Sequence, residues 1–132
     1  MNSLKVPMDL FYSEDHTWIL VEEDEGTIGL TDYAQHELGE IVYIELLDVG
    51  TEILQGLTFG TIEAMKTVAE LIAPVSGEII EINETLESEP RLVNTDPYGE
   101  GWMIRVKIHD PEEVDNILTP HDYIHALTGE EM

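Results

Sequence analysis

Cysteine is absent from the 132-residue chain, and basic side chains are scarce. Without a thiol the chain can form no disulfide, thiolate metal site or cysteine nucleophile, so any redox chemistry has to come from an attached group. Lysine and arginine number 5 against 29 aspartates and glutamates, for a formal net charge of −24. Such a surface repels nucleic acid and anionic lipid, because binding to phosphate needs Lys and Arg. A surface of this charge favours a soluble monomer. The acidity has two possible explanations, which are attraction to basic docking patches on partner proteins and adaptation to a salty cytoplasm, where dissolved ions screen the self-repulsion.

Long apolar runs are also missing, and none is long enough to span a bilayer. The first residues, Met1 to Lys5, lack the basic-then-apolar pattern of a signal peptide. We therefore expect a cytoplasmic protein that binds neither membranes nor nucleic acid. The length and the hydrophobic fraction of 42% fit one folded domain over residues 1–132.

Short segments rich in β-branched and aromatic residues recur along the chain between turn residues. The acidic turn at 22–26 predicts a hairpin between its flanking strands, and the Pro-Val-Ser-Gly sequence at 74–77 predicts another turn. Many short strands at close spacing, with short peripheral helices, predict a mainly β sandwich or barrel. The expected strands are residues 18–21, 27–30, 40–47, 57–63, 67–72, 78–82 and 102–108.

Helix signals are confined to a few places. Thr31 is placed to cap a short helix that runs through Leu38 and ends at Gly39. The segment before the last strand, which contains Pro90 and Pro97, reads as a polar loop.

The C-terminal part predicts helices at about residues 110–128. Asp110 suits an N-cap, Pro111 suits the first helical position, and Glu113 would complete a capping box. A second helix is expected to start at Thr119 and to stop at Gly129. It presents apolar residues at helical spacing, namely Tyr123, Ile124 and Leu127.

One of the three lysines has a distinctive position. Lys5 lies near the start and Lys107 lies in a charge-alternating strand, whereas Lys66 falls between the predicted strands at 57–63 and 67–72. A lysine at a hairpin tip projects into solvent, where a modifying enzyme can reach its amine. A prosthetic group attached there gains a high effective concentration at each partner's active site. The alternative is an ordinary solvated lysine.

Several strings along nearly the whole chain resemble the glycine-cleavage H-protein family, in the order and spacing of that family. Each string alone would be a weak signal, and together they are specific. The strings cover residues 12–18, 28–35, 38–43, 73–78, 83–84 and 92–102.

The resemblance implies a lipoyl/biotinyl-type hammerhead, or barrel-sandwich hybrid, of two small antiparallel sheets with short peripheral and C-terminal helices. It implies that lipoate is amide-linked to Lys66 by a lipoate ligase or lipoyl transferase. The recognition hairpin would be formed by Glu63, Ala64, Met65 and Thr67 around that lysine.

The resemblance also implies a carrier and not a catalyst. The lipoyl arm would take an aminomethyl group from glycine decarboxylase and deliver it to an aminomethyltransferase, and dihydrolipoyl dehydrogenase would reoxidise the arm. Thiol–disulfide chemistry would then be supplied by a cofactor to a chain that has no thiol.

The sequence departs from the family in three places. Ala64 and Met65 replace the usual Ser-Val before the modified lysine and give the Ala-Met-Lys of biotin carriers, although Thr67 follows where biotin carriers have Met. Thr17 replaces the glutamate of a His-Glu-Trp string, whose carboxylate helps to hold the aminomethyl ammonium. Leu47 replaces a proline in a turn.

These departures leave alternatives open. An H-like protein can carry lipoate for sulfur oxidation with a heterodisulfide-reductase-like complex, where no ammonium-binding carboxylate is needed, and a biotin carrier is a further alternative. In the glycine-cleavage interpretation, another carboxylate such as Glu14 or Glu37 has to replace the missing one. The residues predicted to line the cleft for the arm are Asp15, Thr17, Glu37 and Glu70.

Other features favour plainer interpretations. His121 and His125 have metal-ligand spacing on a helix but no evident third ligand, so no metal site is predicted. His16 and His36 could approach the arm or simply pack. The acidic carboxylates show no spacing that places an acid–base pair in one cleft, and the chain has no phosphate-binding loop, so no catalytic residue is predicted.

Overall fold

Strands dominate the regular structure of the computed structural model, which describes residues 4–128 of the chain. The strands are β1 (Phe11–Tyr12), β2 (Thr17–Glu22), β3 (Glu25–Leu30), β4 (Ile41–Leu46), β5 (Glu52–Ile53), β6 (Thr58–Ala64), β7 (Val68–Ile72), β8 (Gly77–Ile82) and β9 (Ile104–Ile108). The helices are α1 (Asp32–Leu38), α2 (Thr85–Ser88), α3 (Leu92–Thr95), the 3₁₀ helix η1 (Pro111–Asn116) and α4 (Pro120–Thr128).

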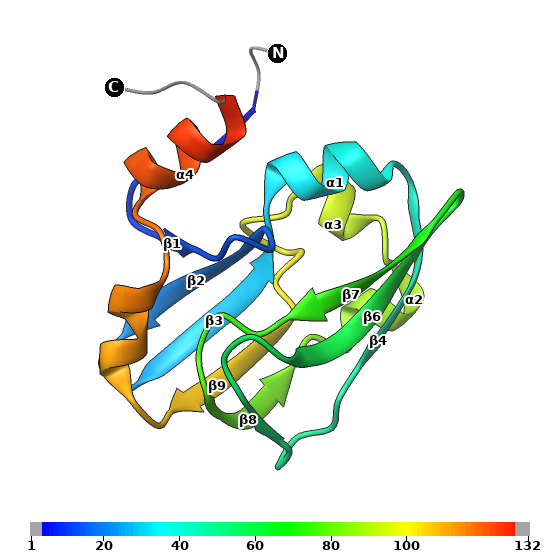
Figure 1. The fold of residues 1–132 in the computed structure, drawn as a ribbon. Helices are drawn as coiled ribbons and strands as arrows, with labels where there is room; N and C mark the ends of the chain where they lie inside the picture. Colours follow the sequence, from blue (N-terminus) through cyan, green and yellow to red (C-terminus); the bar gives the residue numbers. More distant parts are fainter. Residues whose placement is uncertain (1–3, 129–132) are drawn as a thin grey trace.

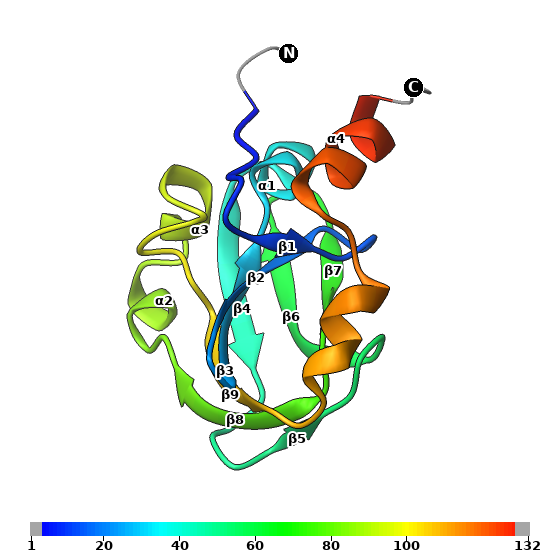
Figure 2. The same cartoon turned by 90° about the vertical axis from the view of Figure 1, so that its left-hand side faces the viewer.

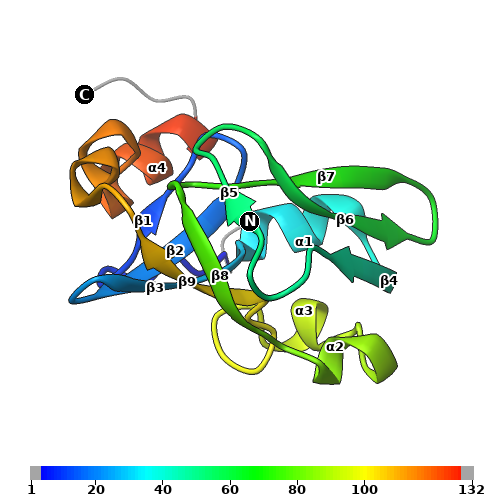
Figure 3. The ribbon, with the colours of Figure 1, turned by 90° about the horizontal axis from the view of Figure 1, so that it is seen from below.

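Two antiparallel sheets face each other, and they are unequal in size (Figure 1). The larger sheet has six strands in the order β1-β2-β3-β9-β8-β5, and the smaller has three in the order β4-β6-β7. Seen from below, β3, β9 and β8 of the larger sheet lie next to one another, and β4, β6 and β7 of the smaller sheet lie to their right (Figure 3). The predicted fold class, mainly β with two antiparallel sheets and short helices, is confirmed.

The hydrophobic core lies between the sheets, because each strand turns alternate side chains inward. Ile19 and Ile28 come from the larger sheet, and Ile62 and Leu71 come from the smaller one, all of them almost completely buried. A second apolar cluster forms where α4 covers β1. The two sheets are therefore held in a fixed relation, which also fixes the hairpin of the smaller sheet.

The local predictions in the first half of the chain are confirmed. The acidic turn joins β2 to β3 with Glu22 opposite Glu25. The Thr31 side chain accepts a hydrogen bond from the Ala34 amide at the start of α1, and Gly39, with a positive φ of 83°, ends that helix.

The segment predicted as a polar loop before the last strand is partly helical, which corrects the prediction. Helices α2 and α3 form within it, each four residues long. Their buried anchors, Leu86 and Val93, join the core between the sheets. Figure 2 shows α2 and α3 beside β4, on the opposite side of the molecule from α4.

The C-terminal prediction is confirmed in its positions but needs correction in its chemistry. The Asp110 carboxylate accepts a hydrogen bond from the Glu112 amide, so Asp110 does cap, but the helix that follows is 3₁₀. Glu113 does not complete a capping box, because its carboxylate accepts hydrogen bonds from the Ser76 amide and hydroxyl at 2.6 and 3.0 Å. Helix α4 starts after Thr119 as predicted, and the expected stop at Gly129 lies outside the described residues.

Candidate functional site

Lys66 lies in the turn between β6 and β7, at the end of the smaller sheet that projects furthest from the core (Figure 1). Glu63 pairs with Val68 as the last cross-strand pair before the turn. The Lys66 side chain is exposed and makes no ion pair or hydrogen bond within residues 4–128. Its amine is therefore free for an approaching enzyme.

The base of this turn is anchored by the backbone. The Ala64 amide donates to the Thr67 carbonyl at 2.8 Å, and the Met65 amide donates to the Glu40 carbonyl at 3.0 Å. The Ala64 side chain is buried in the core, whereas Met65 is 68% exposed. The backbone at the base of the turn is therefore fixed, and the exposed Lys66 side chain extends from it into solvent.

Carboxylates follow the outer face of the smaller sheet toward the turn. Glu70, one of the predicted cleft residues, lies opposite Thr61, which lies opposite Glu45 on β4. Glu45, Glu63 and Glu70 are all exposed. Side chains alternate along these strands, so the three carboxylates lie on the solvent face of the smaller sheet, which leads to the turn that carries Lys66.

A second polar cluster gathers around His16, in the turn between β1 and β2. His16 has a positive φ of 68°, and its carbonyl accepts a hydrogen bond from the Thr31 amide at the start of α1. Its ring lies 4.8 Å from that of Tyr33, centroid to centroid, and its Nδ1 lies 2.9 Å from the Tyr123 hydroxyl. The turn, α1 and α4 therefore meet at this imidazole.

Two predicted cleft residues influence the charge of this imidazole. The carboxylates of Asp15 and Glu37 act on the same imidazole from the β1–β2 turn and from α1, and both are exposed. Burial nevertheless lowers the pKa of His16 below its ordinary 6.5, against the opposing pull of those carboxylates. His16 is consequently neutral near pH 7, so the positive charge that would compete for the two carboxylates is missing.

Thr17 is placed differently from the other three predicted cleft residues. It is 0% exposed, and its hydroxyl donates to the Ile72 carbonyl at 3.0 Å and lies 2.7 Å from the Ser13 hydroxyl. Its side chain joins the start of β2 to the end of β7. Thr17 therefore has no free polar group for an arm passing over the surface.

Tyr123 fixes α4 against this cluster. Its ring stacks on that of Tyr12 at 4.6 Å and 6°, and its hydroxyl lies 2.8 Å from the Thr31 hydroxyl. Burial raises the pKa of Tyr123 to about 12, so the phenol stays protonated and available for hydrogen bonding at ordinary pH.

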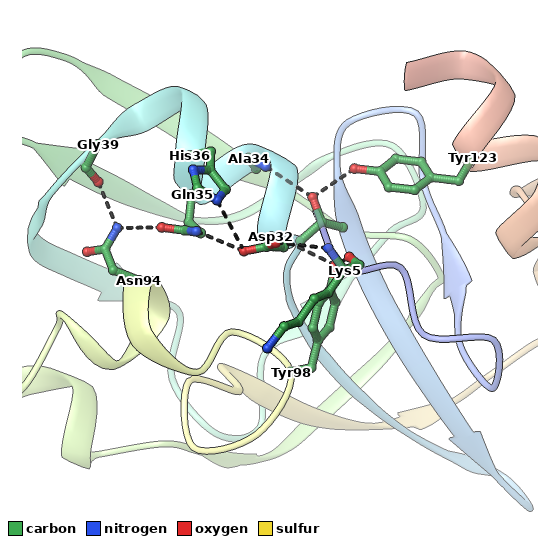
Figure 4. Close-up of polar contacts among 10 residues, drawn as sticks. Lys5, Asp32, Ala34, Gln35, His36, Gly39, Asn94, Tyr98 and Tyr123 are labelled. Carbon is green, nitrogen blue, oxygen red and sulfur yellow. Dashed lines mark hydrogen bonds and ion pairs between the residues drawn. The ribbon is translucent and has the colours of Figure 1, made fainter. Parts of the chain in front are cut away.

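Asn94 links the elements behind the lysine turn, which the sequence alone did not indicate (Figure 4). Its side-chain oxygen accepts from the Ile41 amide at 2.9 Å, and its nitrogen donates to the Gln35 side chain and the Gly39 carbonyl, both at 2.9 Å. Gln35 in turn donates to Asp32 at 2.8 Å. Helices α1 and α3 are thereby tied to the first residue of β4, beside the root of the turn. A lone Asn in a four-residue helix gives no sequence pattern that would reveal this role.

Metal and membrane features give no further site within the described chain. Residues 4–128 hold no group of three His, Asp or Glu side chains arranged for a metal ion. No helix in this range is long and apolar enough to cross a membrane. His36 lies 3.9 Å from an Asp32 oxygen at the surface of α1.

Comparison with known proteins places these features in a family. The family model described as Glycine cleavage H-protein matches residues 10–130. The chain is 51% identical to the glycine cleavage system H protein of Carboxydothermus hydrogenoformans over 95% of this chain and 96% of that protein. It is 46% identical to the protein of the same description from Rubrobacter xylanophilus, over 96% and 98%. The crystal structure of a glycine cleavage system H protein from Mycobacterium marinum superposes with a TM-score of 0.86 at 34% identity, over 95% of this chain and all of the other.

Proposed function

Because the chain belongs to the glycine cleavage H-protein family, we propose that it is a carrier whose Lys66 holds lipoate in amide linkage and conveys an aminomethyl group between partner enzymes. The observation that carries the proposal is the free, exposed amine of Lys66 at a rigid hairpin turn.

The residues around Lys66 suit the attachment of such a group. A modifying enzyme has to reach the amine without unfolding the carrier, and the turn projects beyond both sheets (Figure 1). Glu63, Met65 and Thr67 are exposed beside the lysine, so their side chains are available for recognition by a lipoate ligase or lipoyl transferase. Ala64 is buried, and its part is to fix the turn.

Negative charges at the surface near His16 suit a carried aminomethyl group, whose ammonium is positive. When attached to Lys66, lipoate would supply the thiol–disulfide chemistry that carries the aminomethyl group. Asp15 and Glu37 offer carboxylates to its ammonium, and the neutral imidazole of His16 leaves their charge uncompensated. We propose that this pair replaces the carboxylate that the sequence lacks at Thr17.

The charge of the whole chain supports transient docking with basic surfaces. A net charge of −24 raises association rates with positively charged sites at modest ionic strength. The proposed partners are glycine decarboxylase, aminomethyltransferase and dihydrolipoyl dehydrogenase, and none of the chemistry is assigned to a catalytic residue of this chain.

The test combines modification with exchange. The purified protein is lipoylated, the adduct on Lys66 is confirmed by mass spectrometry, and exchange of labelled bicarbonate into glycine by glycine decarboxylase is measured. We expect efficient exchange for the natural chain and none for Lys66→Arg, with equal free energies of unfolding because the substitution is on the surface. Lys107→Arg is the matched control, since Lys107 is also exposed and its ion pair is a surface contact with Asp24 at 3.4 Å.

The alternatives correspond to other outcomes. A lipoylated chain that gives no exchange, beside an active glycine-cleavage carrier, would transfer the proposal to another lipoate-dependent pathway, with the heterodisulfide-reductase-like complex tested next. A biotinyl mass on Lys66 would instead identify a biotin carrier.

A further inference from the structure

An aromatic groove lies on the outer face of the larger sheet, which is turned away from the smaller sheet. Ile19 and Ile28 point inward to the core, so the side chains that alternate with them, such as Trp18, lie on the outer face. A cavity of about 480 Å³ opens there, and a second of about 460 Å³ adjoins it. Both cavities are lined by Gly99 and Trp102, so they form one elongated groove with Trp102 at its middle.

Two aromatic side chains in the wall of this groove are held by hydrogen bonds. The Trp18 indole donates to the Pro97 carbonyl at 3.1 Å, and the Tyr98 ring lies 5.9 Å from it, centroid to centroid. The Tyr98 hydroxyl accepts from the Asp32 amide at 2.9 Å and donates to the Lys5 carbonyl at 2.7 Å (Figure 4). The wall is therefore formed before any ligand binds, which lowers the entropy lost on binding.

Trp102 differs from these two aromatic residues. Trp18 is 2% exposed, whereas Trp102 is half-buried and lines both cavities. Its indole N–H makes no hydrogen bond within residues 4–128. Trp102 therefore offers a ring face and a free donor to a ligand, and the face of tryptophan attracts cations more strongly than that of the other aromatic residues.

The charge of the groove is negative. Its lining includes four exposed carboxylates, namely Asp9 and Glu81 in the first cavity and Asp96 and Glu100 in the second. Arg105 also lines the first cavity, but its guanidinium is already paired with Glu81 at 2.6 Å and with Glu25. Asp9, Asp96 and Glu100 form no ion pair within the described part of the chain. The groove thus suits a ligand that is cationic and has a planar or apolar body.

We propose that this groove docks an arginine-bearing segment of a partner protein, with the guanidinium against the Trp102 indole. A guanidinium is planar, stacks on aromatic faces and binds carboxylates through two N–H groups at once, which a lysine ammonium does not do. The two cavities accommodate the chain on either side of the arginine. Because the groove faces away from the smaller sheet, a partner bound there leaves the Lys66 turn accessible. The binding does not depend on modification of Lys66, so its failure would leave the proposed function untouched.

The first test is a titration of the unmodified full-length chain with the peptide acetyl-Gly-Gly-Arg-Gly-Gly-amide, followed by ¹⁵N NMR. We expect a saturable shift of the Trp102 indole N–H signal, which the variant Trp102→Leu assigns. The Trp18 indole signal should move less, because its N–H is buried and bonded to Pro97. The control peptide carries citrulline, which has nearly the shape of arginine without its charge. No shift at Trp102, or an equal shift with the citrulline peptide, would overturn the proposal.

The second test compares the affinity of variants for the same arginine peptide, read from the Gly99 amide signal. Trp102→Leu keeps the net charge and removes the aromatic face, so we expect binding about 2- to 5-fold weaker. Glu100→Gln should weaken binding about 2-fold. Its matched control is Glu112→Gln, which removes the same charge from an exposed residue of η1, a helix that lines neither cavity.

Two results would contradict the site. Unchanged affinity in a folded Trp102→Leu chain would show that the indole takes no part. Equal weakening by Glu100→Gln and Glu112→Gln would show that the peptide responds to the net charge and not to the groove, and this comparison decides the outcome even where Trp102→Leu fails to fold.

Discussion

Replacing Asn94 by alanine is expected to lower the free energy of unfolding by about 2–4 kcal/mol. The largest part comes from the Ile41 amide, because the substitution removes the oxygen that accepts its hydrogen bond. Ile41 is fully buried, and an unsatisfied buried donor costs about 1–3 kcal/mol. The bond to the Gly39 carbonyl is exposed, so water replaces part of its contribution, whereas the bond to Gln35 is part-buried like the bond to Ile41.

The assay is urea unfolding, read as the change in midpoint at constant slope. Asn116→Ala is the matched control, because within residues 4–128 the Asn116 side chain makes one hydrogen bond, an exposed one of 3.3 Å to Gln55. We expect a change below about 0.5 kcal/mol. Hydrogen exchange should also quicken at the Ile41 and Met65 amides, since the start of β4 holds the lysine turn. If Asn94→Ala shifts the midpoint no more than Asn116→Ala does, the network does not support the hairpin.

Three further predictions concern pH, packing and salt. Burial lowers the pKa of His16 in the folded state, so His16 contributes stability above about pH 6.5 that is lost as the pH falls toward its folded pKa. The control variant is His16→Asn, because Asn tolerates the positive φ at this position. In urea titrations, the difference in free energy of unfolding between the natural chain and this variant should shrink as the pH is lowered. Gly77→Ala should cost about 1–3 kcal/mol in the same titration, because a Cβ there would lie 2.3 Å from the Lys107 carbonyl; a neutral result would refute the close approach. Raising NaCl from about 0.05 to about 1 M should raise the melting temperature by screening the net charge of −24, and a fall would contradict a repulsive surface.

The parts of the fold that could be predicted from the sequence are those encoded within a few neighbouring residues. The acidic turn between β2 and β3, the Thr31 cap and the Gly39 stop all depend on local backbone preferences. The turn that exposes Lys66 belongs to the same class, since two strand-like segments flank it directly.

The parts that were missed depend on distant partners. Helices α2 and α3 are too short to show a periodic pattern, and they form because Leu86 and Val93 reach the core. Glu113 has the spacing of a capping box, yet the Ser76 amide and hydroxyl, 37 residues away, bind its carboxylate. The two-residue strands β1 and β5 form through their pairing with β2 and β8, and Tyr12 of β1 also bridges to Leu118, 106 residues away.

The candidate site shows the same division. Lys66 could be selected from its position and neighbours, but Thr17 could not be recognised as fully buried until β7 was placed beside it. The electrostatic effect of Asp15 and Glu37 on one imidazole likewise depends on the placement of the β1–β2 turn and α1.

The position of β9 between β3 and β8 has a consequence for the synthesis of the chain. Ile28 pairs with Ile104, so the larger sheet closes only after residues far along the chain are available. Such distant pairing slows folding, whereas the β6–β7 hairpin needs only its own neighbourhood. A nascent or truncated chain that lacks residues 104–108 would expose the edge of β3, and open strand edges pair with those of other chains. Protection from aggregation therefore arrives late in translation, after the lysine-bearing hairpin has already been made.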